Sequence, residues 1–374
     1  MALVHIKDAP DLHGKRVFLR IDLNVPIVNG VISDDYRIRR SLPTITLLRE
    51  AGAKIILASH IESKETNSLK EVSNYLLDLI PHTFIHDYPD ETSRAIVNGL
   101  EEGGVVLLEN LRQYDGEKNN DEQFAKDLAS MADIYINEAF PVSHREHASI
   151  VGVPKFLPGY CGFVFFDEVR NLSRAFEPKK PFLFILGGAK FETKLPLMIK
   201  FYPQADRLFI GGALANDLLR AKGVSVGKSL VSEGNIDFSP FLESDKMLIP
   251  SDVIVDGGEV KSVEDIGADD VIVDAGPDTV RDLSLLIKEV KFIVWNGPLG
   301  NYEKGYSKAT EDLALAIAQS GVDSIVGGGD TLAAIKKLGI ETDFGFVSTG
   351  GGAMLDFLAN ETLPGIIALE NSQK

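Results

Sequence analysis

The chain has 374 residues, of which 44% are hydrophobic and 25% charged, so it is long enough to form two hydrophobic cores of ordinary size. Its formal net charge of −17 excludes a general nucleic-acid-binding surface, because duplex binding draws most of its free energy from Lys and Arg placed against phosphates. A single cysteine, Cys161, a charged N-terminus and no long apolar run lead us to expect a cytoplasmic protein without a disulfide, a signal peptide or a membrane span.

Short, uniformly apolar runs recur along the chain, with helix-like stretches between them. They are too apolar for a sheet with one solvent-exposed face, which predicts buried parallel strands in an α/β fold. The eight runs cover residues 17–21, 54–58, 105–108, 133–136, 182–186, 207–210, 291–295 and 323–326. Helices are predicted at 41–50, 121–131 and 309–319.

Polar residues or glycines follow each apolar run. In an open parallel sheet the carboxyl ends of the strands form the edge where ligands bind. Eight such strand ends are difficult to explain by turn chemistry alone and therefore predict ligand-binding edges. The residues are Asp22, Asn24, Ser59, His60, Glu109, Asn110, Asn137, Gly187, Gly188, Gly211, Gly212, Asn296, Gly297 and 327–329.

The regular pattern breaks between Pro154 and Gly162, where prolines and glycines gather, and a helical stretch then continues to Phe176. Such a break is typical of a domain boundary. We therefore predict two doubly wound, Rossmann-like domains with parallel sheets, covering residues 1–161 and 178–356. Residues 162–177 are predicted to form the connecting helix.

Four glycine-rich turns lie in the second half of the chain, and each leads into a helical pattern. Without Cβ atoms, such turns let backbone N–H groups approach an anion, and the helix N-terminus adds partial positive charge. A tight strand-to-helix turn is the alternative for any one of them, whereas four together favour a nucleotide-binding domain. The turns begin at Gly187, Gly211, Gly327 and Gly350.

The standard nucleotide-binding motifs are absent from the sequence. The stretch from Gly223 to Ser229 has three residues between its glycines where a P-loop has four, and no Gly-x-Gly-x-x-Gly follows a strand. Asp330, which follows three glycines, is a candidate Mg²⁺ ligand because hard cations prefer carboxylate oxygen. A role as the N-cap of a helix is the alternative, and it is compatible with metal binding.

The first half of the chain instead gathers arginines and histidines near the strand ends. Guanidinium groups match phosphate and carboxylate bidentately, so several of them in one pocket would suit a small phosphorylated acid. A single surface arginine is usually a solvated charge, so the prediction depends on the group. Its members are Arg20, Arg37, Arg39, Arg40, His60, Arg112, His144, Arg145 and His147.

Longer motifs make a resemblance specific. In the first half they are Arg20-Ile-Asp-Leu-Asn-Val-Pro26, Asp34-Asp-Tyr-Arg-Ile38, Leu42-Pro-Thr-Ile45, Ser59-His60, Glu109-Asn-Leu-Arg112 and His144-Arg145-Glu-His147-Ala-Ser149. In the second half they are Gly187-Gly-Ala-Lys190 with Lys194, Val294-Trp-Asn-Gly-Pro298, Gly327-Gly-Gly-Asp330 and Ser348-Thr-Gly-Gly-Gly352. In this order, from about residue 17 to Leu369, the chain resembles phosphoglycerate kinases.

The resemblance implies a kinase of glycolysis and gluconeogenesis that reversibly transfers a phosphoryl group between 1,3-bisphosphoglycerate and ADP, giving 3-phosphoglycerate and ATP with Mg²⁺. It implies that residues 1–161 bind 3-phosphoglycerate and residues 178–356 bind the Mg-nucleotide. Residues 162–177 would act as a hinge helix, and residues 357–374 are expected to return to the N-terminal domain. The resemblance also suggests a monomer that binds neither nucleic acid nor membrane.

The resemblance also assigns roles to individual residues of this chain. The acid substrate would be bound by Asp22, Asn24, Arg37, His60, Ser63, Arg112 and Arg145. Nucleotide and metal would be bound by Lys190, Lys194, Gly211, Gly212, Gly276, Asn296, Pro298, Glu303, Gly327, Gly328, Gly329, Asp330 and Thr331, with Asp330 as the metal ligand. The catalytic residues would be Arg37, Lys190, Lys194, Gly328 and Gly351.

This set of residues suits the implied reaction. The nucleophile that attacks ATP is a carboxylate, which is already ionised at neutral pH, so no general base is required. Phosphoryl transfer needs in-line positioning and positive charge at the oxygens of the moving group. Arg37, Lys190 and a magnesium ion at Asp330 would supply both.

The chain departs from the family pattern after Ser59-His60. The family usually has Gly-Arg-Pro there, and its arginine contacts the substrate phosphate, whereas this chain reads Ile61-Glu-Ser-Lys64. The lysine offers a point charge in place of a fork, and Glu62 adds repulsion. We therefore expect weakened affinity for the acid substrate.

Three further departures concern the loops and the hinge. Thr193 replaces an aspartate, Pro141 replaces a glycine, and Phe346 replaces a histidine that would hydrogen-bond near Glu168 of the connecting helix. We expect these changes to retune domain closure and to preserve the chemistry. Two alternatives remain: a catalytically weakened binding or regulatory relative, and a different acid kinase with the same fold. The presence of Arg37, Lys190 and Asp330 together favours the active enzyme.

Overall fold

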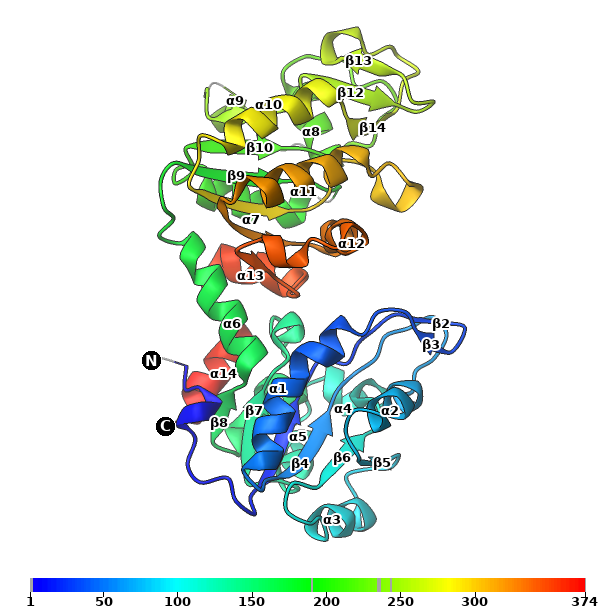
Figure 1. The fold of residues 1–374 in the computed structure, drawn as a ribbon, viewed down its shortest axis with the longest axis vertical. Helices are drawn as coiled ribbons and strands as arrows, with labels where there is room; N and C mark the ends of the chain where they lie inside the picture. Colours follow the sequence, from blue (N-terminus) through cyan, green and yellow to red (C-terminus); the bar gives the residue numbers. More distant parts are fainter. Residues whose placement is uncertain (1–2, 190, 234–236, 243, 374) are drawn as a thin grey trace. The chain divides into compact units, whose positions relative to one another are not determined.

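The computed structural model describes residues 3–189, 191–233, 237–242 and 244–373 (Figure 1). Contacts divide the chain into two units. The first unit comprises Met1–Arg170 and Asn360–Lys374, and the second comprises Asn171–Ala359.

The first unit is built on a six-stranded sheet in which every neighbouring pair is parallel. Its strand order is β5-β6-β4-β1-β7-β8, and the four middle strands are almost entirely buried. This burial explains their uniformly apolar sequences, since helices cover both faces of such a sheet. The strands are β1 (Arg16–Arg20), β4 (Lys54–Ala58), β5 (Thr83–Ile85), β6 (Val105–Leu108), β7 (Ile134–Asn137) and β8 (Gly159–Cys161).

The second unit has a parallel sheet of the same size, in the order β11-β10-β9-β15-β16-β17. Its strands are β9 (Phe182–Leu186), β10 (Arg207–Ile210), β11 (Met247–Leu248), β15 (Phe292–Asn296), β16 (Asp323–Gly327) and β17 (Phe346–Val347). All eight apolar runs form strands of these two sheets. The predicted α/β fold with two parallel sheets is therefore confirmed.

Two strand groups were not expected from the sequence. An antiparallel sheet of β12 (Asp252–Val255), β13 (Val260–Ser262) and β14 (Ile272–Ala275) belongs to the second unit, and a short hairpin of β2 (Ile27–Val28) and β3 (Val31–Ile32) belongs to the first. Each strand of the antiparallel sheet contains at least one polar residue, and the apolar hairpin strands are only two residues long.

The three predicted helices are present, with shifted ends. Helix α1 (Tyr36–Glu50) begins five residues before the predicted start and contains Pro43 in its interior. The other two are α5 (Glu122–Ala129) and α11 (Lys308–Ser320). The remaining α-helices are α2 (Lys70–Leu77), α3 (Glu91–Asn98), α4 (Asp115–Lys118), α6 (Phe163–Leu172), α7 (Phe191–Phe201), α8 (Ala213–Ala221), α9 (Ser239–Leu242), α10 (Pro277–Ile287), α12 (Gly329–Leu338), α13 (Gly352–Asn360) and α14 (Pro364–Ser372). Within the described ranges, none of these helices has the length and hydropathy needed to cross a bilayer.

The C-terminal helix α14, red in Figure 1, packs on the first unit although it follows the second in sequence. The amide of Gly365 donates to the carbonyl oxygen of Ser143 at 2.9 Å, and the amide of Gly159 donates to Ser372 Oγ at 3.1 Å. The chain therefore passes from the first unit to the second and back again.

Helix α6 leaves the first unit through a junction built around the buried Glu138 carboxyl group, directly after β7. The Thr44 hydroxyl of α1 lies 2.5 Å from Oε1, and the Val164 amide of α6 lies 3.2 Å from both carboxyl oxygens. A Cβ atom on Gly162 would lie 1.9 Å from Oε2, so only glycine fits there. Burial outweighs these hydrogen bonds and raises the pKa of Glu138 to about 8, which keeps the group protonated at neutral pH.

We expect Glu138→Gln to remove part of the pH dependence of stability. An acid with a raised pKa stabilises the fold below its ordinary value of 4.5, and this contribution is lost as the pH rises through 8. Relative to the variant, the wild type should lose about 3 kcal/mol of unfolding free energy between pH 5 and pH 8. Urea unfolding followed by circular dichroism measures this, with Glu101→Gln, an exposed acid of the same unit, as the control. Parallel pH profiles for wild type and Glu138→Gln would contradict it.

Candidate active site

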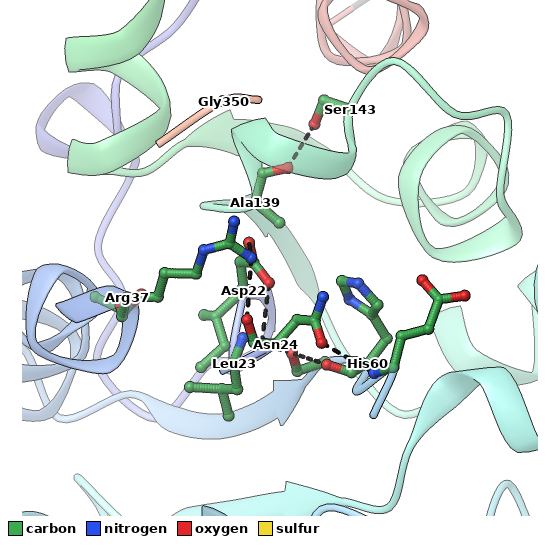
Figure 2. A network of polar contacts seen from close by, with 12 residues as sticks. Asp22, Leu23, Asn24, Arg37, His60, Ala139, Ser143 and Gly350 are labelled. Carbon is green, nitrogen blue, oxygen red and sulfur yellow. Dashed lines mark hydrogen bonds and ion pairs between the residues drawn. The ribbon is translucent and has the colours of Figure 1, made fainter. Parts of the chain in front are cut away.

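The loops after β1 and β4 meet at the carboxyl edge of the first sheet. The Leu23 amide donates to Ser59 Oγ at 2.9 Å, which ties one loop to the other. Arg37 of α1 reaches this edge, where its Nη1 lies 3.0 Å from Asp22 Oδ2 and donates to the Asn24 carbonyl oxygen at 3.0 Å (Figure 2). The Asp22 side chain is only 6% exposed and that of Arg37 is 34% exposed. The buried carboxylate therefore holds a guanidinium group that solvent can reach.

His60 follows β4 and is buried beside the equally buried Arg20. Its Nδ1 lies 3.2 Å from Arg20 Nη2, and a guanidinium can only donate, so Nδ1 accepts and Nε2 carries the proton. Burial, and after it the positive charge of nearby arginines, holds the pKa of His60 well below its ordinary value of 6.5. His60 is therefore a neutral donor through Nε2. The arginines that act on it are Arg20, Arg112, Arg145 and Arg37.

Arg20 has a supporting role behind the surface of this site. Its Nε donates to Ser149 Oγ at 2.9 Å, and Ser149 in turn donates to both carboxylate oxygens of the fully buried Glu117, at 2.6 and 2.9 Å. Burial lowers the pKa of Arg20, and the Glu117 charge opposes that effect. Glu117 is not recognisable as a site residue from the sequence, because its segment has the composition of an exposed turn.

Arg112, Arg145 and His147 lie on the loops after β6 and β7. The Arg112 side chain is 4% exposed, and its backbone amide is fixed by Asn110 Oδ1 at 3.1 Å. Burial, followed by the charges of Arg112 and Arg145, lowers the pKa of His147 to about 4. In the described part of the chain, the Arg145 guanidinium makes no hydrogen bond or ion pair. The electrostatic coupling of both arginines to His60 and His147 indicates that these groups share one positively charged cluster.

Other candidates of the first unit lie outside this cluster or make local contacts. Arg39 is exposed and pairs with Asp35 within α1, and Arg40 Nη1 lies 3.4 Å from the Tyr36 hydroxyl. Ser63 Oγ accepts from the Glu65 amide at 3.1 Å within its own loop. Only part of the predicted group of cations is therefore gathered at the sheet edge.

In the second unit, the turns after β9 and β15 pack backbone against backbone. The Gly187 amide donates to the Asn296 carbonyl oxygen at 2.9 Å, and the Gly188 amide donates to the Pro298 carbonyl oxygen at 2.8 Å. A Cβ atom on Gly187 would lie 2.2 Å from the Pro298 oxygen, and one on Gly297 would lie 2.3 Å from the Gly187 oxygen. These turns cannot carry side chains.

Helix α12 follows β16 through three glycines. Its N-cap is Gly328, with φ of 106°, so the alternative of Asp330 as the N-cap is wrong and Asp330 lies in the first turn. Burial, and then the charge of Glu303, raises the pKa of Asp330. Thr331 is fully buried, and its Oγ1 has no hydrogen-bond partner among the residues that the structure describes. A carboxylate and a free hydroxyl thus occur together at a helix N-terminus.

Lys194 of α7 lies next to Asn296 at the end of β15. Its side chain is almost fully buried, and its ammonium group donates to Asn296 Oδ1. Burial lowers the pKa of Lys194 to about 8. Lys190, the other predicted catalytic lysine, lies outside the described residues.

The remaining predicted glycines of the second unit fall at helix starts. Gly212 is the N-cap of α8 and Gly276 is the N-cap of α10. Gly276 packs against the Asp252 carboxylate, from which a Cβ atom would lie 2.2 Å away. Gly351, with φ of 52°, directly precedes α13. The carboxyl edge of this sheet therefore presents several helix N-termini, with Gly211 preceding that of α8.

Comparison with known proteins covers nearly the whole chain. The phosphoglycerate kinase family model matches residues 6–361. The phosphoglycerate kinase of Caulobacter vibrioides is 41% identical over 390 residues, covering 97% of this chain and 98% of the relative. That of Dictyoglomus turgidum is 40% identical over 383 residues, covering 96% and 97%.

Solved structures agree with the sequence comparison. The phosphoglycerate kinase structure from Coxiella burnetii has a TM-score of 0.86 and 36% identity, and the match covers 100% of both chains. The structure from Pyrococcus horikoshii has a TM-score of 0.87 and 31% identity, with 99% of both chains covered. With sequence and fold matched from end to end, this chain belongs to the phosphoglycerate kinase family.

Proposed function

We propose that this chain catalyses phosphoryl transfer between 1,3-bisphosphoglycerate and ADP with the groups gathered at its two sheet edges. As a family member it is a phosphotransferase with a carboxyl group as acceptor, acting in glycolysis with phosphoglycerate and ADP or ATP as substrates. The observation that carries the assignment of its residues is the cationic cluster of the first unit. In a protein of net charge −17, such a cluster marks the place where a small polyanion binds.

The first unit, residues 1–161 in our assignment, would bind 3-phosphoglycerate. Asp22 and Asn24 hold Arg37 in place. His60 offers an N–H donor on an imidazole that stays neutral at physiological pH. Arg112 and Arg145 supply guanidinium groups for the acidic ends of the substrate. Ser63, at the position of the missing arginine, adds no charge, so we assign it at most a hydroxyl contact.

The second unit, residues 178–356 in our assignment, would bind the nucleotide. The glycine turns at Gly211, Gly212 and Gly276, together with Pro298, would surround the base and ribose. The phosphates would meet Lys190, Lys194, Asn296, Gly351 and the α12 N-terminus from Gly327 to Thr331, with Glu303 nearby. Backbone N–H groups and a helix dipole suit phosphates there.

The same helix start fits a magnesium ion. Asp330 offers a carboxylate oxygen whose ionisation a cation would favour, and the unpartnered Thr331 Oγ1 offers a second oxygen. Within the described ranges, no cluster of three or more His, Cys, Asp or Glu side chains could hold a metal. When bound, Mg²⁺ would neutralise negative charge on the phosphate oxygens.

The chain's own residues would then perform the transfer by positioning and charge. The acceptor carboxylate is ionised at neutral pH and needs no base. Arg37 would place positive charge on the oxygens of the transferring group, and the lysines would do so from the nucleotide side. Because both substrates must meet, we assign the hinge to residues 162–177 and the return segment to 357–374. We further propose a cytoplasmic monomer.

A coupled assay of ATP formation from 1,3-bisphosphoglycerate and ADP tests the function. We expect turnover with purified protein that depends on Mg²⁺. The weakened-relative alternative predicts substrate binding without turnover. The alternative of a different acid kinase predicts that another phosphorylated acid, and not 3-phosphoglycerate, raises the melting temperature.

Nucleotide binding should take up protons near pH 8. Lys194, whose pKa is lowered to about 8, is half deprotonated there, and nucleotide phosphates would raise that pKa again. Calorimetric titration of ADP in two buffers of different ionisation enthalpy should show uptake of roughly half a proton at pH 8 and almost none at pH 6.5. Lys194→Met should abolish the uptake and Lys200→Met, on the same helix, should keep it. Equal heats in both buffers at pH 8 would refute the assignment.

A further inference from the structure

The loop after β4 is held rigidly beside the cationic cluster. Asn110 brackets Ile61, accepting from its amide at 3.2 Å and donating to its carbonyl oxygen at 3.0 Å. Asn24 Oδ1 accepts from the Glu62 amide at 2.9 Å. Two side-chain amides therefore fix the backbone that leads into Glu62, at Ile61 and at the Glu62 amide itself.

Glu62 directs its carboxylate at Arg112, one of the guanidinium groups of the cluster. Oε2 accepts a hydrogen bond from Arg112 Nη1. The two side chains differ sharply in exposure, since that of Arg112 is 4% exposed and that of Glu62 is 61% exposed. The same Asn110 that holds the Ile61 backbone also fixes the Arg112 amide. The pair is thus anchored from both ends.

The other edge of the Arg112 guanidinium is unpaired. Its Nε and Nη2 are buried and have no hydrogen-bond partner in the part of the chain that the structure describes. Buried guanidinium donors without partners are costly, and an oxyanion would satisfy them bidentately. Arg112 therefore has one edge paired with an internal carboxylate and one buried edge whose donors lack a partner.

Glu62 remains charged while it occupies this position. Burial opposes its ionisation, but the hydrogen bond and charge of Arg112, with the charges of Arg145 and Lys118, outweigh that effect and lower the pKa of Glu62. The negative charge of Glu62 therefore lies beside the unpaired edge of Arg112 at neutral pH. It both offsets the charge of Arg112 and repels an incoming anion.

We propose that Glu62 is a built-in competing anion that sets a reduced affinity of the Arg112 site for the phosphorylated acid. The inference rests on the proposed function for the identity of the ligand, and on the geometry of the pair for the competition. Because the carboxylate is more than half exposed, water screens it and the effect is modest. Removing its charge should tighten ligand binding about two- to fivefold.

The test compares wild type with Glu62→Gln, which keeps the shape and an acceptor oxygen for Arg112 Nη1. Calorimetric titration with 3-phosphoglycerate and, separately, with inorganic phosphate gives the dissociation constants. Glu101→Gln, an exposed acid whose loop enters the opposite end of β6, removes the same charge away from the site. We expect tighter binding of both ligands only in Glu62→Gln, a gain that shrinks in high salt, and a lower KM for 3-phosphoglycerate at unchanged kcat.

The stability of the ligand-free protein should change in the opposite direction to the ligand affinity. Losing the ion pair leaves Arg112 with a weaker partner, so the melting temperature without ligand should fall slightly, while the shift caused by 3-phosphoglycerate should grow. Unchanged or weaker binding of both ligands by Glu62→Gln would overturn the inference and leave the proposed function intact. If neither protein binds 3-phosphoglycerate but the variant binds phosphate more tightly, the proposed function fails and the competition stands.

Discussion

Replacing Arg37 with alanine is expected to lower kcat by about 10²–10³-fold, which is the usual cost of removing one positioned donor from a developing charge. Within the cationic cluster of the first unit, Arg37 is held by the Asp22 carboxylate and the Asn24 carbonyl oxygen. Its side chain is also accessible to solvent. Without it, the nearly buried Asp22 carboxylate would also stand unpaired and repel the acid substrate. KM for 3-phosphoglycerate should therefore rise as kcat falls. Steady-state kinetics in the coupled assay measures both.

Two further variants separate the possible causes. Arg37→Lys keeps a positive charge and loses the planar fork, so it should recover part of the activity. Arg39→Ala removes an exposed arginine from the same helix, where it pairs with Asp35 and the Tyr75 hydroxyl outside the cluster, and should stay close to wild type. A folded Arg37→Ala protein whose kcat lies within threefold of wild type would exclude Arg37 from the transfer step.

Asp330→Asn should abolish the magnesium dependence of nucleotide binding and lower activity by at least about 10²-fold. The amide keeps the shape of the side chain but loses the charge that a hard cation requires. Burial and the nearby Glu303 make the ionised Asp330 unfavourable in the ligand-free protein. The variant should therefore be as stable as wild type or more so, and a loss of activity would not reflect unfolding.

Titration of ADP with and without a chelator measures this effect. Wild type should lose affinity when Mg²⁺ is removed, whereas Asp330→Asn should show the same weak binding in both conditions. Asp343→Asn, an exposed acid of the same unit, is the matched control and should behave as wild type. If Asp330→Asn retained a chelator-sensitive affinity, the metal would have to be assigned to other residues.

The sequence predicts the two sheets well because their strands are buried on both faces. A run such as 182–186 has no polar member, which is typical of a central parallel strand buried on both faces. The antiparallel sheet was not predicted because each of its three short strands contains at least one polar residue, such as Lys261 in β13. The early start of α1 was missed because Pro43 suggests a helix beginning, whereas the structure accommodates it in the interior.

The candidate site was predictable where chemistry follows directly from a strand end, as for Asp22 and His60. It was not predictable where a residue acts by pairing with another that is distant in the sequence. Glu117 has a role only because a buried guanidinium, nearly a hundred positions earlier, needs a countercharge, and no local pattern reveals that need. The roles of Arg20 and Arg37 likewise depend on how deeply each side chain is buried, which the sequence alone does not give.

The contact between the turns at Gly187 and Gly297 limits how this architecture can diversify. A Cβ atom on either glycine would lie too close to a carbonyl oxygen of the facing turn, so a substitution would have to displace the backbone of these turns. Backbone geometry therefore excludes side chains at Gly187 and Gly297. The Glu62 side chain, by contrast, is 61% exposed, so its exchange would not require the backbone to move. Under the competition proposed for Glu62, an exchange at this one position would change substrate affinity and leave the backbone in place.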